Sequence, residues 1–235
     1  MKKQVYTVLI LLCGAIAAKA QTQIQNSGWL FLMNSTKFND KWGMHMDVQL
    51  RTNDDWDGLR NLLIRPGLTY YINENSDVTL GYLYTPTFLH LDGIAKSSIT
   101  EHRIWQQYIY KHKLAGVNVS HRFRLEQRFV ERISGDNFFA QRARYFIRGI
   151  IPLQKSAGAF EKGVFVALQN ELFLNVQAKG ELNGHMFDQN RAYGAAGYRF
   201  SKKLDVELGY MNQSLRGSEN NTSNNIVQLA VYTRF

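Results

Sequence analysis

Most of the chain alternates apolar and polar residues with a period of two. In the segment 116–131 the apolar residues share one parity: Val117, Val119, Phe123, Leu125 and Phe129. The other parity is polar: Asn118, Ser120, Arg122, Arg124, Glu126 and Arg128. Successive side chains of an extended strand point to opposite faces, so this period predicts strands with one apolar and one polar face.

The same alternation recurs along the chain, separated by connections that are alternately short and long. We predict strands over 28–36, 41–52, 59–72, 77–87, 99–113, 116–131, 138–152, 161–175, 188–200, 203–215 and 224–235. The segments 73–76, 114–115 and 201–203 are tight turns, whereas 88–98, 176–187 and 217–223 are longer and polar. Short turns on one side and long loops on the other are typical of outer-membrane barrels.

The fold class predicted is therefore all-β: an antiparallel transmembrane β-barrel of 10–12 strands after a cleaved signal peptide. Single-chain bacterial barrels have even strand numbers, so an odd set of segments favours twelve. Either 28–36 is not a full strand or a further short strand begins near Gln21. Pro66 and Pro86 fall inside predicted strands, where proline is tolerated mainly at bulges and strand ends.

The beginning of the chain has the features of a secretory signal. Lys2 and Lys3 precede an apolar run over 8–16, and the small residues of Ala18-Lys19-Ala20 suit a signal peptidase. The run is shorter than the roughly 20 residues of a spanning helix. We expect residues 1–20 to be a signal peptide and 21–235 to form the barrel domain. The only cysteine, Cys13, lies in the signal, so disulfides are not expected.

The segment 226–235 also alternates and ends on Phe235. A terminal phenylalanine resembles the assembly signal that barrel-assembly machinery recognises. The expected location is the cell outer membrane, with the assembly machinery, outer-membrane lipids and lipopolysaccharide as partners. The sequence leaves the oligomeric state open.

The charge balance is basic but does not indicate a nucleic-acid partner. The formal net charge is +9, and it falls to +6 without residues 1–20, which contain three lysines and no acid. The basic residues alternate with apolar ones and do not cluster in runs, as a nucleic-acid-binding segment would. We expect the positive charge inside the barrel or against lipopolysaccharide phosphates.

Charged residues define an inward face. An arginine facing lipid at mid-bilayer depth would cost about 2–4 kcal/mol, so the polar parity must face the lumen. This parity predicts a lumen ion-pair network of Glu101, Arg103, Arg122, Arg124, Glu126, Arg128, Arg142, Arg144, Arg148, Glu171, Arg191, Arg199, Asp205 and Glu207.

The predicted turn at 114–115 sets a register for the central hairpin. It places Glu101 across from Arg128 and Arg103 across from Glu126. Cross-strand pairs of opposite charge stabilise a sheet by about 0.2–1 kcal/mol.

A turn about Lys202 likewise places Arg199 across from Asp205. The network has two interpretations. It either fills the lumen, in a structural role or with passage of small solutes, or forms a narrow arginine-rich path that prefers anions.

Other candidate chemistry is sparse. A lipid-modifying enzyme would need an outward histidine beside a nucleophile, and the candidate histidines are His102 and His121. Ser120 precedes His121 but points to the opposite face of the strand. No catalytic residue is therefore assigned. His45 and Asp47 share the lumen face, but two ligands without a third are more typical of a hydrogen-bonded pair, so no metal or cofactor is expected. An outward aromatic girdle is predicted from Trp29, Trp42, Tyr82, Tyr84, Tyr108, Tyr110 and Tyr210.

Several segments together resemble a family of uncharacterised Gram-negative outer-membrane β-barrel proteins, a domain of unknown function. They are Glu101-His102-Arg103-Ile104-Trp105-Gln106-Gln107, Arg122-Phe123-Arg124-Leu125-Glu126-Gln127-Arg128-Phe129, Asn170-Glu171, Phe187-Asp188-Gln189-Asn190-Arg191 and Glu207-Leu208-Gly209-Tyr210-Met211. The resemblance covers essentially the whole chain after the signal. It implies the fold and the location, and it brings no activity, substrate or catalytic residue.

Overall fold

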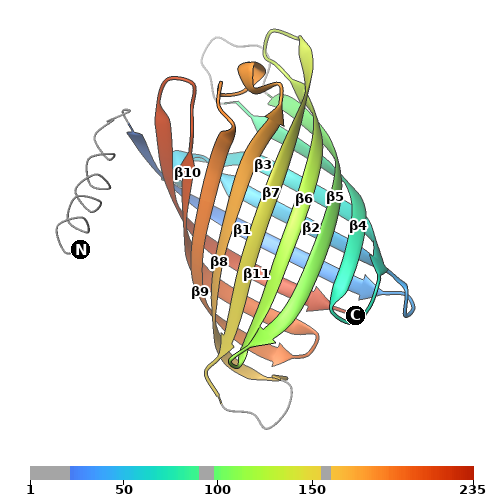
Figure 1. The fold of residues 1–235 in the computed structure, drawn as a ribbon. Helices are drawn as coiled ribbons and strands as arrows, with labels where there is room; N and C mark the ends of the chain where they lie inside the picture. The colour runs from blue at the N-terminus through green and yellow to red at the C-terminus, as the bar shows by residue number, and fades with distance from the viewer. Residues whose placement is uncertain (1–21, 90–97, 155–159) are drawn as a thin grey trace, which may run out of the picture.

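The strands of the protein wrap into one closed barrel (Figure 1). The computed structural model describes residues 22–89, 98–154 and 160–235. The predicted signal over 1–20 lies outside these residues, so it stays a prediction. No helix in the described ranges is both long and apolar enough to cross a membrane.

The described residues form eleven strands and two short 3-10 helices. The strands are β1 (Thr22–Lys37), β2 (Trp42–Thr52), β3 (Leu59–Tyr71), β4 (Ser76–Phe88), β5 (Ser98–Leu114), β6 (Val117–Glu131), β7 (Asn137–Pro152), β8 (Gly163–Gln177), β9 (Phe187–Ser201), β10 (Leu204–Leu215) and β11 (Asn221–Arg234). The helices are η1 (Asp54–Trp56), after β2, and η2 (Lys179–Glu181), after β8. The predicted all-β barrel is confirmed.

The barrel closes by a parallel pairing of β1 with β11, from Thr22 opposite Asn221 to Ser35 opposite Arg234. All other neighbouring strands are antiparallel. With an odd number of up-and-down strands, the first and last run in the same direction and must pair in parallel to remove the sheet edge. The preference for twelve strands is therefore not met, because 22–37 forms one uninterrupted strand.

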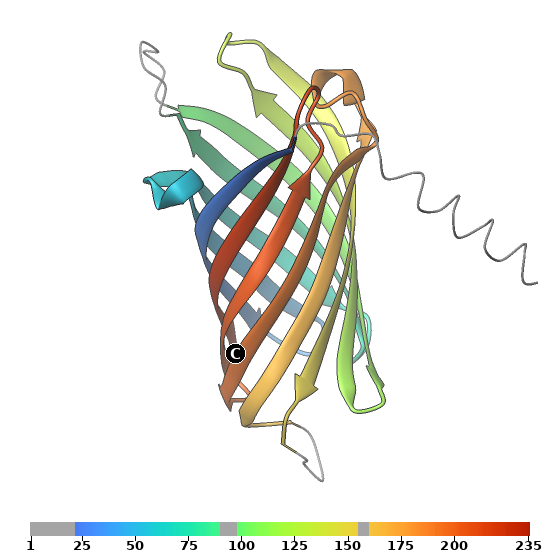
Figure 2. The same cartoon turned by 90° about the vertical axis from the view of Figure 1, so that its left-hand side faces the viewer.

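Most connections separate by length, as the sequence predicts, with short ones at one end of the barrel and longer ones at the other. The exception is the connection 153–162 between β7 and β8, which is long but joins its strands at the end with the short turns. The tight turns after β3, β5 and β9 lie at one end of the barrel, and the longer connections after β8 and β10 lie at the other (Figures 1 and 2). The C-terminus lies at the tight-turn end, opposite the start of β1.

The two prolines interrupt one ladder. Pro66 lies inside β3 and Pro86 inside β4, and neither residue has an N–H group to donate. Pairing between these strands is sparse beside them and becomes continuous only towards the tight turn: Asn61 opposite Thr87, Ile64 opposite Tyr84, then a run from Gly67 opposite Gly81. The prolines are thus accommodated by gaps in pairing, inside the strands.

The register of the central hairpin differs from the prediction by two residues. Arg103 lies opposite Arg128, and Glu126 lies opposite Trp105. The turn consists of Ala115 and Gly116, with φ angles of 48° and 86°. Two-residue hairpins favour type I′ turns, which need positive φ at both positions, and Gly116 meets that need. A shift of two preserves which face each side chain occupies.

The two faces of the barrel differ as the parity predicts. On β6, Phe123 is 52% exposed and Leu125 38%, whereas Arg124 is 3% exposed and Glu126 1%. The apolar face is therefore turned outward, and the charged face into the lumen. The second predicted register, Arg199 opposite Asp205, is confirmed, with a bulge beside it at Leu204.

The hairpin turn provides a test of this register. We expect Ala115→Gly to raise the free energy of unfolding by about 0.5–1 kcal/mol, because alanine is strained at positive φ and glycine is not. Gly116→Ala should lower it by a similar amount for the same reason. Urea unfolding in detergent micelles measures both. Changes of the same sign in the free energy of unfolding for the two substitutions would contradict the type I′ turn.

Candidate functional site in the barrel lumen

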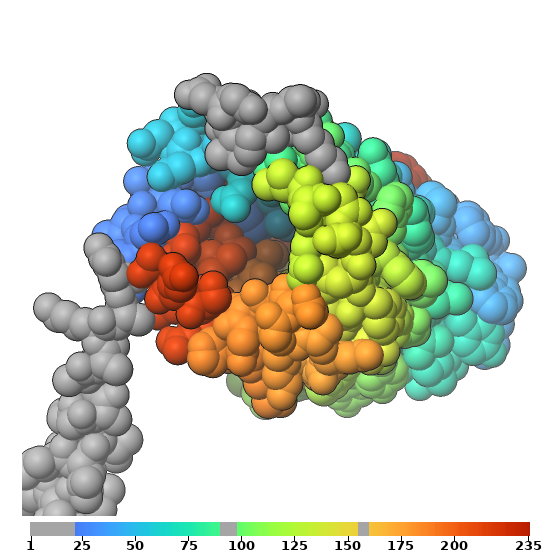
Figure 3. Space-filling model, turned by 90° about the horizontal axis from the view of Figure 1, so that it is seen from above, coloured from blue at the N-terminus to red at the C-terminus, as the bar shows by residue number. Residues whose placement is uncertain are grey.

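The lumen contains a cavity of about 1650 Å³. From above, a hollow opens between the connections that follow β6, β8 and β10 (Figure 3). Charged, amide and aromatic side chains from all parts of the wall line it. Its chemistry depends on how the arginines of the inner face are paired.

Glu126 is the centre of the deepest group of ion pairs. Its Oε2 accepts hydrogen bonds from Arg142 Nε at 3.0 Å and Nη2 at 2.7 Å, and Oε1 accepts one from Arg144 Nη1 at 2.5 Å. Arg103 Nη1 reaches the same carboxylate at 3.4 Å, and Arg124 Nη1 lies 4.0 Å away. One carboxylate therefore holds arginines from β5 and β7 in addition to its own strand.

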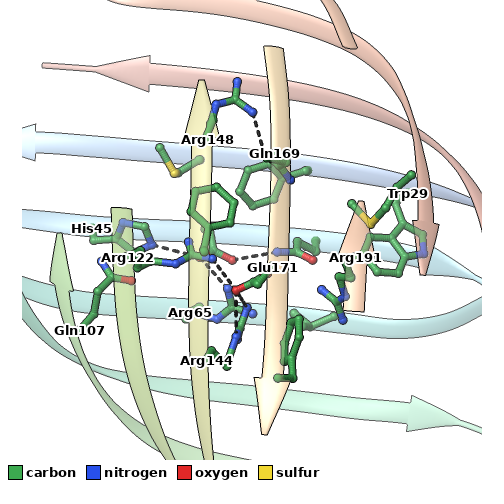
Figure 4. A pocket seen from close by; sticks show the side chains of 18 of the residues that line it. Trp29, His45, Arg65, Gln107, Arg122, Arg144, Arg148, Gln169, Glu171 and Arg191 are labelled. Atoms are coloured by element: carbon green, nitrogen blue, oxygen red, sulfur yellow. Dashed lines mark hydrogen bonds and ion pairs between the residues drawn. The ribbon is translucent and has the colours of Figure 1, made fainter. Parts of the chain in front are cut away.

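Glu171 on β8 joins β6 to β7. Its Oε1 accepts hydrogen bonds from Arg144 Nη2 at 2.6 Å and from Arg122 Nη2 at 2.7 Å (Figure 4). Because Arg144 bonds both Glu171 and Glu126, the two carboxylates belong to one connected network.

Glu101 pairs with two arginines despite the shifted register. Arg103 Nε donates to it at 2.7 Å and Arg128 Nε at 2.6 Å. Both predicted partnerships of this hairpin therefore occur, but Arg128 reaches Glu101 diagonally, and Arg103 reaches Glu126 diagonally. Long side chains bridge the diagonal positions of neighbouring strands.

The remaining carboxylates pair separately. Arg148 donates to Glu207 across the lumen, from β7 to β10. Asp205 accepts from Arg199 Nε at 2.7 Å and from Arg234 Nη2 at 2.7 Å. The sequence reasoning missed Arg234 as a member of this group.

The predicted His45 and Asp47 pair exists and has a third member. His45 Nε2 lies 3.0 Å from Asp47 Oδ2, which also accepts from Arg65 Nη1 at 3.0 Å. In the described part of the chain no three metal-ligating side chains gather. The sequence reasoning also missed Arg65 and Asp188, the latter bonded to Arg142 at 2.8 Å.

Three arginines are bound mainly by neutral amides. Arg51 donates to Gln49 Oε1 from Nε at 3.1 Å, Arg191 to Gln189 Oε1 at 3.0 Å, and Arg124 to Gln107 Oε1 at 3.1 Å. Within the described ranges neither Arg51 nor Arg191 forms an ion pair. An amide oxygen satisfies a guanidinium N–H without neutralising its charge. The positive charge of Arg51 and Arg191 therefore stays in the lumen, whereas Arg124 also lies 4.0 Å from the Glu126 carboxylate.

Each of these arginines lies over an aromatic ring. The Arg51 guanidinium carbon lies 3.9 Å from the Trp29 ring centre and that of Arg191 5.0 Å from it. The corresponding distance from Arg124 to Trp105 is 4.4 Å. Such contacts fix a guanidinium by its face and leave its N–H edge free.

The position of Trp29 differs from the prediction, which places it in the outward aromatic girdle. Trp29 is 7% exposed and lies in the lumen, not in the outward girdle, because both faces of β1 are apolar over residues 29–33 and parity cannot distinguish them there. The other predicted girdle residues are exposed on the outside. Arg51 and Gln49 share the parity of Asp47, so the pattern of 41–52 contained the signal for them.

The outward histidines bond other aromatic side chains. His102 Nδ1 bonds the Tyr82 hydroxyl, and His121 bonds His112 Nε2 at 3.1 Å and the Tyr145 hydroxyl at 2.9 Å. These contacts form two separate polar aromatic groups on the outer wall, towards opposite ends of β5 and β6.

Phe235 lies beside β1. Its backbone N–H donates to the Ser35 carbonyl at 2.9 Å, and its side chain is exposed. Its role as an assembly signal stays a prediction.

Fold and lumen together define a porin-like β-barrel. The chain belongs to the family described as "Protein of unknown function (DUF2490)", which matches residues 26–224. An uncharacterized protein of Methylorubrum extorquens is 28% identical over 227 residues, covering 94% of this chain and 93% of the relative. The solved NanC porin has a similar fold, with a TM-score of 0.51 and 13% identity, over 81% of this chain and 85% of the porin chain. The resemblance to an uncharacterised barrel family is thus confirmed.

The depth of the ion pairs predicts unequal effects of two matched changes. Glu126→Gln should lower the free energy of unfolding by about 3–5 kcal/mol, because it leaves buried arginines without their shared counter-charge. Glu101→Gln should cost less, since the Glu101 side chain is 14% exposed against 1% for Glu126. Urea unfolding in micelles gives the comparison, and a larger loss for Glu101→Gln would contradict this ranking.

Proposed function

We propose that this protein is an outer-membrane channel that admits small anions into an arginine-rich lumen. The outward apolar face and the likeness to a protein named a porin support the membrane location. The lumen cavity supports passage, and the arginines that lack a carboxylate partner support the preference for anions.

The observation that carries the proposal is the amide pairing of Arg51 and Arg191, both of which line the cavity. Where an arginine faces a carboxylate, the two opposite charges cancel, and the pair exerts little net field on a distant ion. Where it faces glutamine, the charge remains, and the apolar wall around the lumen concentrates its field. Rings of arginine or lysine select anions in pores for this reason.

The structural interpretation, in which ion pairs fill the lumen, is supported by the groups around Glu126 and Glu171. We favour passage because a large cavity remains beside these groups. The lipid-modifying alternative needs a nucleophile beside His102 or His121. The contacts of these histidines with tyrosine and histidine give it no support.

The location has a simple test. The protein should fractionate with the outer membrane and migrate faster on a gel before boiling than after it, because a barrel with paired backbone groups resists detergent until heated. Recovery in the soluble periplasm with unchanged mobility would contradict the membrane assignment.

The conductance test addresses the function itself. In planar bilayers under a KCl gradient we expect steady openings whose reversal potential shows preference for chloride. Arg51→Gln combined with Arg191→Gln should reduce this preference. A silent bilayer would favour the filled structural barrel, and a preference for potassium would refute the anion proposal.

A further inference from the structure

We infer that Arg51, Arg191 and Trp29 form a specific binding site for an oxyanion, a carboxylate or phosphate group, in the lumen. This inference rests on the proposed function and deepens it: the lumen would bind its solute at a defined place in addition to attracting it. A guanidinium presents N–H donors in a fork that matches the two oxygens of such a group.

The three residues come from three separate strands that the closure brings together. Trp29 lies on β1, Arg51 on the neighbouring β2, and Arg191 on β9, beyond β11 and β10. Figure 4 shows Arg191 beside the Trp29 indole. All three line the lumen cavity, so a small solute in it can reach them.

The donors of both arginines are only partly used. In the described residues, Arg191 donates a hydrogen bond only from Nε, and Arg51 from Nε and Nη2. Further N–H groups of each guanidinium are thus available towards the cavity. Gln49 and Gln189 hold the two groups in place, and Trp29 lies against both.

The local field is positive. Guanidinium groups of Arg191, Arg65, Arg103 and Arg144 act electrostatically on Arg51. Assembling like charges is unfavourable unless something offsets it, and a bound anion offsets it most directly. Glu171 also acts electrostatically on Arg191, but it is hydrogen-bonded to Arg144 and Arg122.

The glutamines allow a test that keeps the size of the side chain, although each substitution removes an amide N–H that donates to Asp47 or Asp188. Gln49→Glu and Gln189→Glu keep the oxygen that binds each arginine but cancel its charge. The matched control is Gln169→Glu: Gln169 Oε1 accepts from Arg148 Nη1 at 2.8 Å (Figure 4), but Arg148 already has Glu207 as a partner. All three changes add one negative charge to the lumen.

The experiment titrates the purified full-length barrel in detergent, at low ionic strength, with inorganic phosphate and, separately, with acetate. Calorimetry gives the affinity. We expect each of Gln49→Glu and Gln189→Glu to weaken binding about tenfold, and Gln169→Glu to change it less than twofold. Trp29→Phe should abolish the change in tryptophan fluorescence that accompanies binding.

Equal weakening by all three variants would mean that the lumen attracts anions without this site, and would overturn the inference. Absence of binding of both probes to the unmodified protein would also overturn it. Should Gln49→Glu fail to fold, as judged by heat-modifiability, Gln189→Glu and Arg191→Gln decide the question. Anion-selective conductance without localised binding would preserve the proposed function alone, and localised binding without conductance would preserve the inference alone.

Discussion

The constraint on which the structure depends is that a charged side chain cannot face lipid. Every ionised group in the middle of a strand must therefore turn inward, into the enclosed lumen. This sets the face of each strand, and it brings many arginines into one enclosed volume. The arginines enclosed in the lumen then need partners for their positive charges and their N–H groups.

The arginines of the lumen have two kinds of partner. Around Glu126 and Glu171, carboxylates shared by several arginines form a connected group that joins β5, β6, β7 and β8. Around Trp29, glutamines and the indole ring satisfy Arg51 and Arg191 without neutralising them. Replacing one partner of a buried ion pair is strongly destabilising, so the first group has a structural role. The second group leaves charge available for a solute.

Parity was the part of the fold that the sequence could predict. It depends only on the period of two, and it placed the network residues from Glu101 to Glu207 on the correct face even where the register was wrong. Register depends on the turn, and the central hairpin shifted by two residues because Ala115 and Gly116, not Leu114 and Ala115, form the turn.

Pairings between strands that are not neighbours, such as Arg148 with Glu207, follow from the curvature of the closed sheet. No local pattern contains that information. Of the amide-bound arginines only Arg51 was missed. Arg124 and Arg191 were predicted for the lumen, but Arg191 was placed in an ion-pair network and is bound by Gln189 instead, because attention to opposite charges overlooks a neutral partner.

The parallel pairing of β1 with β11 closes the barrel, and no turn joins these two strands to define their register. β1 and β11 are far apart in the sequence, and over residues 29–33 both faces of β1 are apolar. Neither a hairpin nor the lipid constraint on this segment therefore fixes how the two strands align. Side-chain contacts provide the alignment: Ser27 donates to Asn224 at 3.1 Å, Asn34 to Thr233 at 2.9 Å, and the rings of Phe31 and Tyr232 meet edge to face at 5.5 Å. The same alignment turns Trp29 inward to meet Arg191 from β9. The candidate anion site and the closure of the barrel therefore depend on one register, and a slip of one residue along this seam would move Trp29 out of the lumen.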